Sequence, residues 1–205
     1  MTVATVDRAD LLRRGRTLEL FTIVWNSAEG LVSVALGVLA GSIALIGFGI
    51  DSFIETSSGA VLLWRLQTRR DAESAERAEV TALRLVGASL LALAAYVTYD
   101  SMATLIRRDA PEASLPGIAL AVVSLIVMPL LARQKRKVAA ALDSHALEAD
   151  AMQTSICMYL SAILLGGLTL NALLGWWWAD PMAALAMVPL IAREGLEAWR
   201  GERCD

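Results

Sequence analysis

The chain has 205 residues, of which 57% are hydrophobic, and its mean hydropathy is +0.56. Its net charge of −3 is too small to indicate a partner. Several apolar runs are long enough to cross ~30 Å of hydrocarbon, which takes roughly 20 helical residues. This composition excludes a soluble globular domain and predicts an integral protein of the cell membrane, surrounded by the lipid bilayer and without a nucleic-acid partner. The sequence contains no P-loop, GxGxxG, HExxH or CxxC pattern, so an enzyme is not expected.

Apolar segments alternate with short polar ones along the chain, a pattern that predicts an all-α bundle of six transmembrane helices. Residues 1–17 form a leader, residues 18–196 the transmembrane domain, and residues 197–205 a short tail with no soluble domain after it. The fifth helix is expected to start between Ala139 and Asp150, before the membrane. The predicted spans are about 18–40, 43–66, 80–106, 118–131 (with a start near Leu115 as an alternative), a fifth ending near 174, and 182–192.

Basic residues give the orientation. If both termini are cytoplasmic, every lysine and arginine except Arg107 and Arg108 falls on the inner side of the membrane. Lysine and arginine are enriched in cytoplasmic loops of membrane proteins. We therefore expect the N- and C-termini to be cytoplasmic.

The connections between spans are short. Gly41 and Ser42 join the first two spans in a tight hairpin, and the prolines and glycine of RRDAPEASLPG mark a loop after the third span. Asp180 precedes Pro181 at the start of the sixth span, and aspartate is a favoured N-cap residue. Asp180 is thus expected to be the N-cap of the sixth helix.

The second span carries two ionisable residues, Asp51 and Glu55, which are four positions apart and therefore share a helix face. From the outer turn they lie roughly 13 Å and 19 Å along the helix at 1.5 Å per residue. Ionisable groups at membrane depth are costly and usually mark a functional site. A buried carboxylate pair suits a divalent cation or a proton. The alternative is a pair of neutral, hydrogen-bonded packing residues.

The fifth span places Gln153 and Cys157 at a similar depth and with the same spacing. A divalent cation sheds its hydration only for a comparable set of donors, which two such pairs supply. The four predicted metal ligands are thus Asp51, Glu55, Gln153 and Cys157. For the fifth-helix pair a packing role is equally supported, because cysteine is a common buried residue and glutamine often bonds between helices.

Three further polar residues fall within predicted spans. Asn26 and Glu29 lie three positions apart on the first span, where they complete the metal site, relay protons or pack between helices. Asp100 lies in the third span, nearer the outer side, and lines an exit path in one interpretation. These three are the accessory candidates.

Three motifs resemble those of the cation diffusion facilitator (cation efflux) family. GSIALIGFGIDSFIE resembles its second-helix signature, in which a His or Asp is followed four residues later by an Asp; Asp51 and Glu55 occupy those positions. EADAMQTSIC resembles the fifth-helix signature at Gln153 and Cys157, and WADPMAAL matches the Asp-Pro that opens the sixth helix. The resemblance covers the six predicted helices.

The resemblance implies export of a divalent metal cation by proton antiport, with metal and protons competing for the same carboxylate oxygens. Zn²⁺ is the first expectation, because a four-ligand site with a possible thiolate suits it. Mn²⁺, Fe²⁺, Co²⁺ and Cd²⁺ stay open. The sequence departs from the pattern at Glu55, which replaces Asp, and at Gln153 and Cys157, which replace a His or Asp pair. It also ends before the soluble domain that such family members carry.

Two other functions are compatible with these departures. One is a membrane interaction or regulatory protein that keeps the transporter fold without transport. The other is a proton-coupled exporter of small organic cations, with Glu29 and the carboxylate pair as counter-charges. A homodimer packed through the first three helices is also compatible with the sequence.

Overall fold

The computed structural model describes residues 8–67 and 72–200, with the backbone alone for residues 65–67, 72–83, 145, 146 and 149. The leader and tail predicted from the sequence therefore lie partly outside the described residues. Within these ranges the chain forms six α-helices, which confirms the predicted fold class. They are α1 (Arg8–Ala40), α2 (Ile43–Gln67), α3 (Ala72–Arg107), α4 (Leu115–Leu142), α5 (His145–Leu174) and α6 (Ala179–Arg200).

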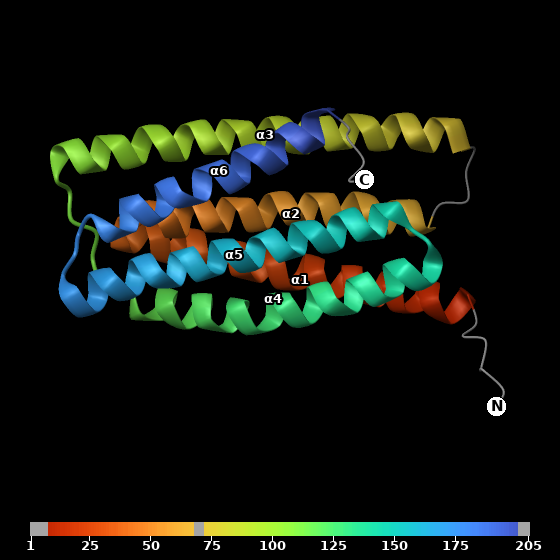
Figure 1. The fold of residues 1–205 in the computed structure, drawn as a ribbon, viewed down its shortest axis with the longest axis horizontal. Helices are drawn as coiled ribbons and strands as arrows, with labels where there is room; N and C mark the ends of the chain where they lie inside the picture. The colour runs from red at the N-terminus through yellow and green to blue at the C-terminus, as the bar shows by residue number, and fades with distance from the viewer. Residues whose placement is uncertain (1–7, 68–71, 201–205) are drawn as a thin grey trace.

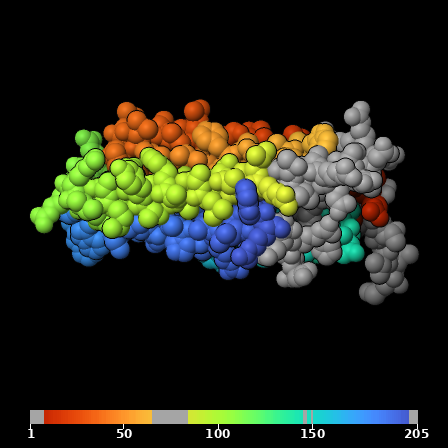
Figure 2. Space-filling view, turned by 90° about the horizontal axis from the view of Figure 1, so that it is seen from above, coloured from red at the N-terminus to blue at the C-terminus, as the bar shows by residue number. Residues whose placement is uncertain are grey.

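The six helices form one elongated bundle (Figure 1). The α1–α2 pair and the α4–α5 pair are hairpins packed on each other, and α3 packs chiefly against α6. One end of the bundle gathers the α1–α2, α3–α4 and α5–α6 connections, while α1, α3 and α5 begin at the other end. Figure 2 shows α3 along one face, with α1 and α2 on one side of it and α6 on the other.

Helix length and composition identify four candidate membrane spans among the described residues. They are Arg8–Ala40, Arg84–Arg107, Leu115–Leu142 and Asp150–Leu174. The two helices outside this set, α2 and α6, carry ionisable residues such as Asp51 and Glu194 within their length. Those residues are buried against the other helices, as intramembrane charges usually are.

The fourth helix is longer than the sequence predicted. It continues past Leu131 through the basic block RQKRK and ends at Leu142, where Asp143 adopts a left-handed conformation. The sequence interpretation ended the fourth span at Leu131, before this block. The helix continues because Lys135 and Val138 extend the buried face that Met128 and Leu131 begin, at the spacing of a helix stripe.

The first helix has a polar interior face and an apolar exterior face. Its buried positions recur every three or four residues and are Gly15, Glu19, Thr22, Asn26, Glu29, Gly30, Ser33, Gly37 and Ala40. Its exposed positions include Leu20, Phe21, Val24, Leu31, Val38 and Leu39. This distribution is the reverse of a soluble amphipathic helix and suits lipid outside and a polar path inside.

Glycines bring α1 and α2 close together. A Cβ atom added to Gly49 would lie 2.9 Å from the carbonyl oxygen of Gly30 and 2.7 Å from the Val34 side chain, so only glycine fits there. At the turn, Gly41 has φ +65°, a conformation that glycine adopts without strain. The predicted tight hairpin is thereby confirmed.

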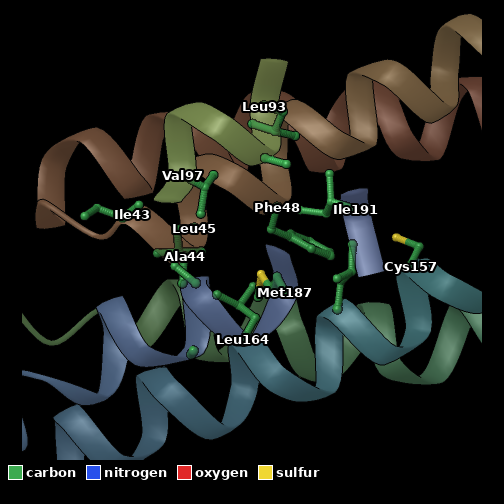
Figure 3. Close-up of a cluster of buried hydrophobic side chains, with 14 of the residues drawn as sticks. Ile43, Ala44, Leu45, Phe48, Leu93, Val97, Cys157, Leu164, Met187 and Ile191 are labelled. Carbon is green, nitrogen blue, oxygen red and sulfur yellow. The ribbon is translucent and has the colours of Figure 1, made fainter. Parts of the chain in front are cut away.

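Apolar side chains fill the bundle between the hairpins. Phe48 of α2 lies at the centre of a cluster that includes Val97 of α3 and Met187 of α6 (Figure 3). Cys157 belongs to the same cluster and lies at one edge of the view. This packing holds α2, α5 and α6 in the positions from which they present polar residues.

The sequence predicted that Asp180 is the N-cap of α6, and this prediction is wrong. The helix already begins at Ala179, and the Asp180 carboxylate crosses to the start of α2 instead. It accepts hydrogen bonds from the Ser42 hydroxyl at 2.5 Å and from the Ile43 backbone N–H at 3.0 Å. Asp180 thus satisfies the unpaired N–H groups at the N-terminus of another helix.

Candidate functional site

The two carboxylates of α2 are buried in the middle of the bundle. Asp51 is 5% exposed and Glu55 is 1% exposed. The Glu55 carboxylate accepts a hydrogen bond of 2.9 Å from the Thr154 hydroxyl of α5, and its other oxygen has no hydrogen-bond partner among the described residues. At the contact between α2 and α5, the Glu55 carboxylate can therefore accept a further hydrogen bond or bind a cation.

The fifth helix brings the other two predicted ligands to the same region from its own side. Cys157 is buried beside Glu55, within electrostatic reach of Asp51. Gln153 is only partly buried and faces α6. The structure thus brings Cys157 together with Glu55, whereas Gln153 has a different nearest partner.

That partner is Glu194 of α6. Glu194 is 9% exposed and lies close to the Gln153 amide and within electrostatic reach of Asp51 and Glu55. One of its oxygens has no hydrogen-bond partner among the described residues. Glu194 therefore adds a third helix and a third carboxylate to the site, and the sequence analysis did not single it out.

The accessory candidates of α1 also lie close to the site. Glu29 accepts a hydrogen bond of 3.3 Å from the Ser52 hydroxyl of α2, and its charge acts on Glu55 and Asp51. Asn26 is fully buried, and neither its amide oxygen nor its amide nitrogen has a partner among the described residues. Both residues face the bundle interior and offer polar atoms to an ion or to water.

A charged cluster lies next to Glu55 on the side from which α1 and α5 begin. Lys135 of α4 is fully buried and donates hydrogen bonds to Asp150 and Thr154 of α5 and to Glu19 of α1. Thr154 joins this cluster to the site through its bond to Glu55. Lys135 is the sole buried cation among the residues whose burial the structure describes.

The carboxylates surround the site without converging on one point. Across the described residues, no three histidine, cysteine, aspartate or glutamate side chains lie close enough together to hold a metal ion. The arrangement supplies oxygen and sulfur donors from α2, α5 and α6. These donor side chains would have to move closer together to bind one cation.

Asp100 is remote from these residues. It accepts a hydrogen bond of 3.2 Å from the Tyr96 hydroxyl and lines a cavity of about 390 Å³ at the end of the bundle that holds the α1–α2 turn. Gly41 and Pro111 line the same cavity. No described contact joins Asp100 to Asp51 or Glu55. Its place nearer the outer side and its role in an exit path stay predictions.

Helical spacing signals the residues that the sequence analysis missed. Glu194 lies three residues after the buried Ile191, which itself lies four residues after the buried Met187. Lys135 lies four residues after Leu131, which lies three residues after Met128. Such intervals place a residue on the buried face of its helix. Both residues lie beyond the predicted ends of their spans, at Leu131 and Ala192, so the sequence analysis did not consider them.

Comparison with known proteins identifies the class to which this fold and site belong. The family model of the cation efflux transmembrane domain matches residues 20–200, which cover most of α1 and all of α2 to α6. The chain therefore belongs to the cation efflux family. It is a multi-pass membrane protein that carries the transmembrane domain of this family.

Curated relatives agree with this family. A putative transporter, MamV, of Paramagnetospirillum magneticum is 29% identical over 91% of this chain and 57% of its own length. An uncharacterized transporter of Synechocystis sp. is 26% identical over 79% of this chain and 55% of its own. The cation-efflux pump FieF of Shewanella oneidensis is 28% identical over 40% of this chain and 27% of its own. The chain spans about half the length of the first two relatives.

Proposed function

We propose that this chain exports a divalent metal cation in exchange for protons, through a site between α2, α5 and α6. The observation that carries the proposal is the placement of Asp51 and Glu55. Both carboxylates are buried in mid-bundle, and Cys157 and Glu194 approach them from two other helices.

The charge balance of the bundle supports a cationic substrate. Isolated carboxylates are expensive to bury, so a cluster of them needs cations or protons to neutralise it. Lys135 is already engaged by Asp150 and Glu19, which leaves Asp51, Glu29 and Glu194 without a cationic partner among the described residues. A divalent cation neutralises two of these charges at once.

Exchange for protons follows from the same oxygens. A metal ion binds the ionised form of each carboxylate, and a proton binds it in the metal's place. Binding of a metal ion therefore releases protons, and its departure on the outer side readmits them. Movement of the α1–α2 and α4–α5 hairpins relative to α3 and α6 would open the site to each side in turn.

Donor chemistry favours Zn²⁺ over the alternatives. Carboxylate oxygens and a cysteine sulfur are both ordinary zinc ligands, and zinc accepts four of them without a strict geometric preference. Oxygen donors alone discriminate poorly between Mn²⁺, Fe²⁺ and Co²⁺. Cys157 is therefore the side chain on which a preference for Zn²⁺ or Cd²⁺ depends.

The test is metal-dependent proton flux in proteoliposomes that contain the purified chain, scanned over Zn²⁺, Mn²⁺, Fe²⁺, Co²⁺ and Cd²⁺. We expect flux with Zn²⁺ in the unmodified chain and its loss in Asp51→Asn. Asp10→Asn is the matched control, because it removes one exposed carboxylate at the start of α1. Its flux should equal that of the unmodified chain.

Two outcomes contradict the proposal. Flux that persists in Asp51→Asn removes the carboxylate pair from the mechanism. No flux with any metal, from chain that reconstitutes as a folded helical protein, favours a regulatory role on the same fold. Gln153→Ala and Cys157→Ala separate the fifth-helix ligands: if both retain flux, the site uses Asp51, Glu55 and Glu194 instead.

A further inference from the structure

Lys135 occupies a cage of oxygen atoms from two other helices. Its ammonium nitrogen lies 3.5 Å from a Glu19 carboxylate oxygen of α1 and 3.3 Å from the Thr154 hydroxyl of α5. It also forms a short ion pair with Asp150. The lysine and Glu19 are fully buried, and Asp150 is nearly so. A charged amine in such a place substitutes for a bound cation.

The cage contains two acidic side chains and one amine. Glu19 and Asp150 together carry two negative charges when ionised, and the ammonium carries one positive charge. Each carboxylate also has one oxygen without a hydrogen-bond partner among the described residues. A divalent cation would match the charge of the pair and engage those oxygens.

The cage is continuous with the transport site. The Thr154 hydroxyl lies against both Lys135 and Glu55. Helix α2 closes the cage at Gly59, where an added Cβ would lie 3.4 Å from the Glu19 carboxylate. The cage lies nearer than Glu55 to the end where α1 and α5 begin, the end predicted to be cytoplasmic.

We propose that Glu19, Asp150 and Thr154 form a second cation subsite on the cytoplasmic side of Glu55, filled by the Lys135 ammonium in this conformation and by the divalent substrate when the ammonium leaves. Lys135 is then a tethered competitor of the metal ion. It keeps the subsite neutralised between transport cycles and returns to it after the metal has moved on to Glu55. The inference rests on the proposed transport function, but its test measures binding rather than flux.

The first experiment counts metal ions per chain. Purified Lys135→Ala, Lys135→Arg and unmodified chain are dialysed to equilibrium against Zn²⁺, and bound zinc is measured by elemental analysis. We expect Lys135→Ala to bind about one ion more than the unmodified chain, because removal of the ammonium frees the oxygens that a metal requires. Lys135→Arg keeps the cation and should bind no extra ion. Lys137→Ala, an exposed lysine of the same segment, is the matched control.

Double variants separate this proposal from the proposed function. The extra ion should disappear in the double variant Lys135→Ala with Asp150→Asn. It should persist in Lys135→Ala with Asp51→Asn when the count is compared with that of Asp51→Asn alone, because the cage does not use Asp51. Absence of an extra ion in folded Lys135→Ala overturns the subsite, whatever the flux measurement shows. Loss of flux in Asp51→Asn leaves the subsite unaffected.

A second experiment uses the unmodified chain and decides the question if Lys135→Ala does not fold. A small amine-reactive reagent is applied with and without saturating Zn²⁺, and labelled lysines are identified by mass spectrometry. Lys135 should be protected without metal and labelled with it, while the exposed Lys137 is labelled in both conditions. Protection of Lys135 that is unchanged by saturating Zn²⁺ contradicts displacement by the substrate.

Discussion

The side chain of Glu194 shows how one residue changes the chemistry of the site. It comes from α6, lies close to Gln153 of α5, and is within electrostatic reach of the Asp51 and Glu55 carboxylates of α2. We therefore propose a second role for Gln153, the orientation of Glu194. We propose that Glu194 compensates on the sixth helix for the replaced residues of the fifth.

Substitution of Glu194 tests this compensation. Glu194→Gln keeps the size of the side chain and removes its charge, so we expect metal affinity to fall roughly tenfold, or ~1.4 kcal/mol. The measurement is the Zn²⁺ concentration dependence of flux in proteoliposomes. Glu197→Gln, one turn further along α6 and ion-paired with Arg193 at the surface, is the matched control. An unchanged concentration dependence in Glu194→Gln would remove it from the site.

At the scale of helices, hydrogen bonds to the Asp180 carboxylate connect α6 to the start of α2. Its carboxylate bonds Ser42 and Ile43, so the end of α2 that leads toward Asp51 is fixed by a residue far away in the sequence. This bond replaces a local N-cap. It explains an Asp-Pro pair at the start of α6 without any contact between Asp180 and the candidate metal site.

Removal of this cap should destabilise the bundle. Asp180→Ala leaves the first N–H groups of α2 unpaired, and loss of a cap costs about 0.5–2 kcal/mol. We expect a lower thermal unfolding midpoint in detergent for Asp180→Ala, with a smaller loss for Asp180→Asn, whose amide oxygen still accepts hydrogen bonds. Asp109→Ala, at an exposed position of the α3–α4 loop, should unfold as the unmodified chain does. Equal midpoints for Asp180→Ala and the unmodified chain would contradict the capping role.

The approach of α1 to α2 gives a second prediction at this scale. In Gly49→Ala the new methyl group would lie 2.7 Å from the Val34 side chain and 2.9 Å from backbone atoms of α1, so the helices must separate. Overpacking of this kind costs about 1–3 kcal/mol. The control is Gly166→Ala in α5, where an added Cβ meets nothing within 4 Å. That variant should be neutral or up to ~1 kcal/mol more stable in thermal unfolding, through helix propensity. A neutral Gly49→Ala would show that this contact is looser than described.

For the whole molecule, orientation in the membrane sets the direction of transport. The starts of α1 and α5 and the end of α4 lie at one end of the bundle (Figure 1), which is also where Arg13, Arg14 and Lys137 lie along those helices. Arg107 and Arg108 lie at the end that holds the α3–α4 loop. The separation agrees with cytoplasmic termini under the positive-inside rule.

Cysteine labelling tests the orientation. Asp10→Cys and Asp109→Cys place a thiol at opposite ends of the bundle, and both positions are exposed. A membrane-impermeant maleimide added to intact cells should label Asp109→Cys and leave Asp10→Cys unlabelled until the membrane is opened. Both variants are made with Cys204→Ser, because the sequence has a second cysteine at that position. The other native cysteine, Cys157, is buried and should stay unlabelled. The opposite pattern would invert the topology and turn the proposed exporter into an importer.

Several features of this protein follow from the sequence by itself. Apolar runs of membrane length predict the helices, because backbone groups in lipid must bond within their own segment. The four-residue spacing of Asp51 and Glu55 places them on one face of α2, and both are buried as that spacing indicates. The family resemblance rests on the same local motifs, and the match over residues 20–200 confirms it.

The tertiary structure alone decides which distant residues meet. Helical spacing places Lys135 on a buried face, but only the packing of α4 against α1 and α5 gives it Glu19 and Asp150 as partners. The cap of α2 by Asp180 likewise joins two helices that are far apart in sequence. A periodic pattern fixes the side of its own helix that faces inward, whereas the partner across the interface depends on how the helices are rotated and shifted against each other.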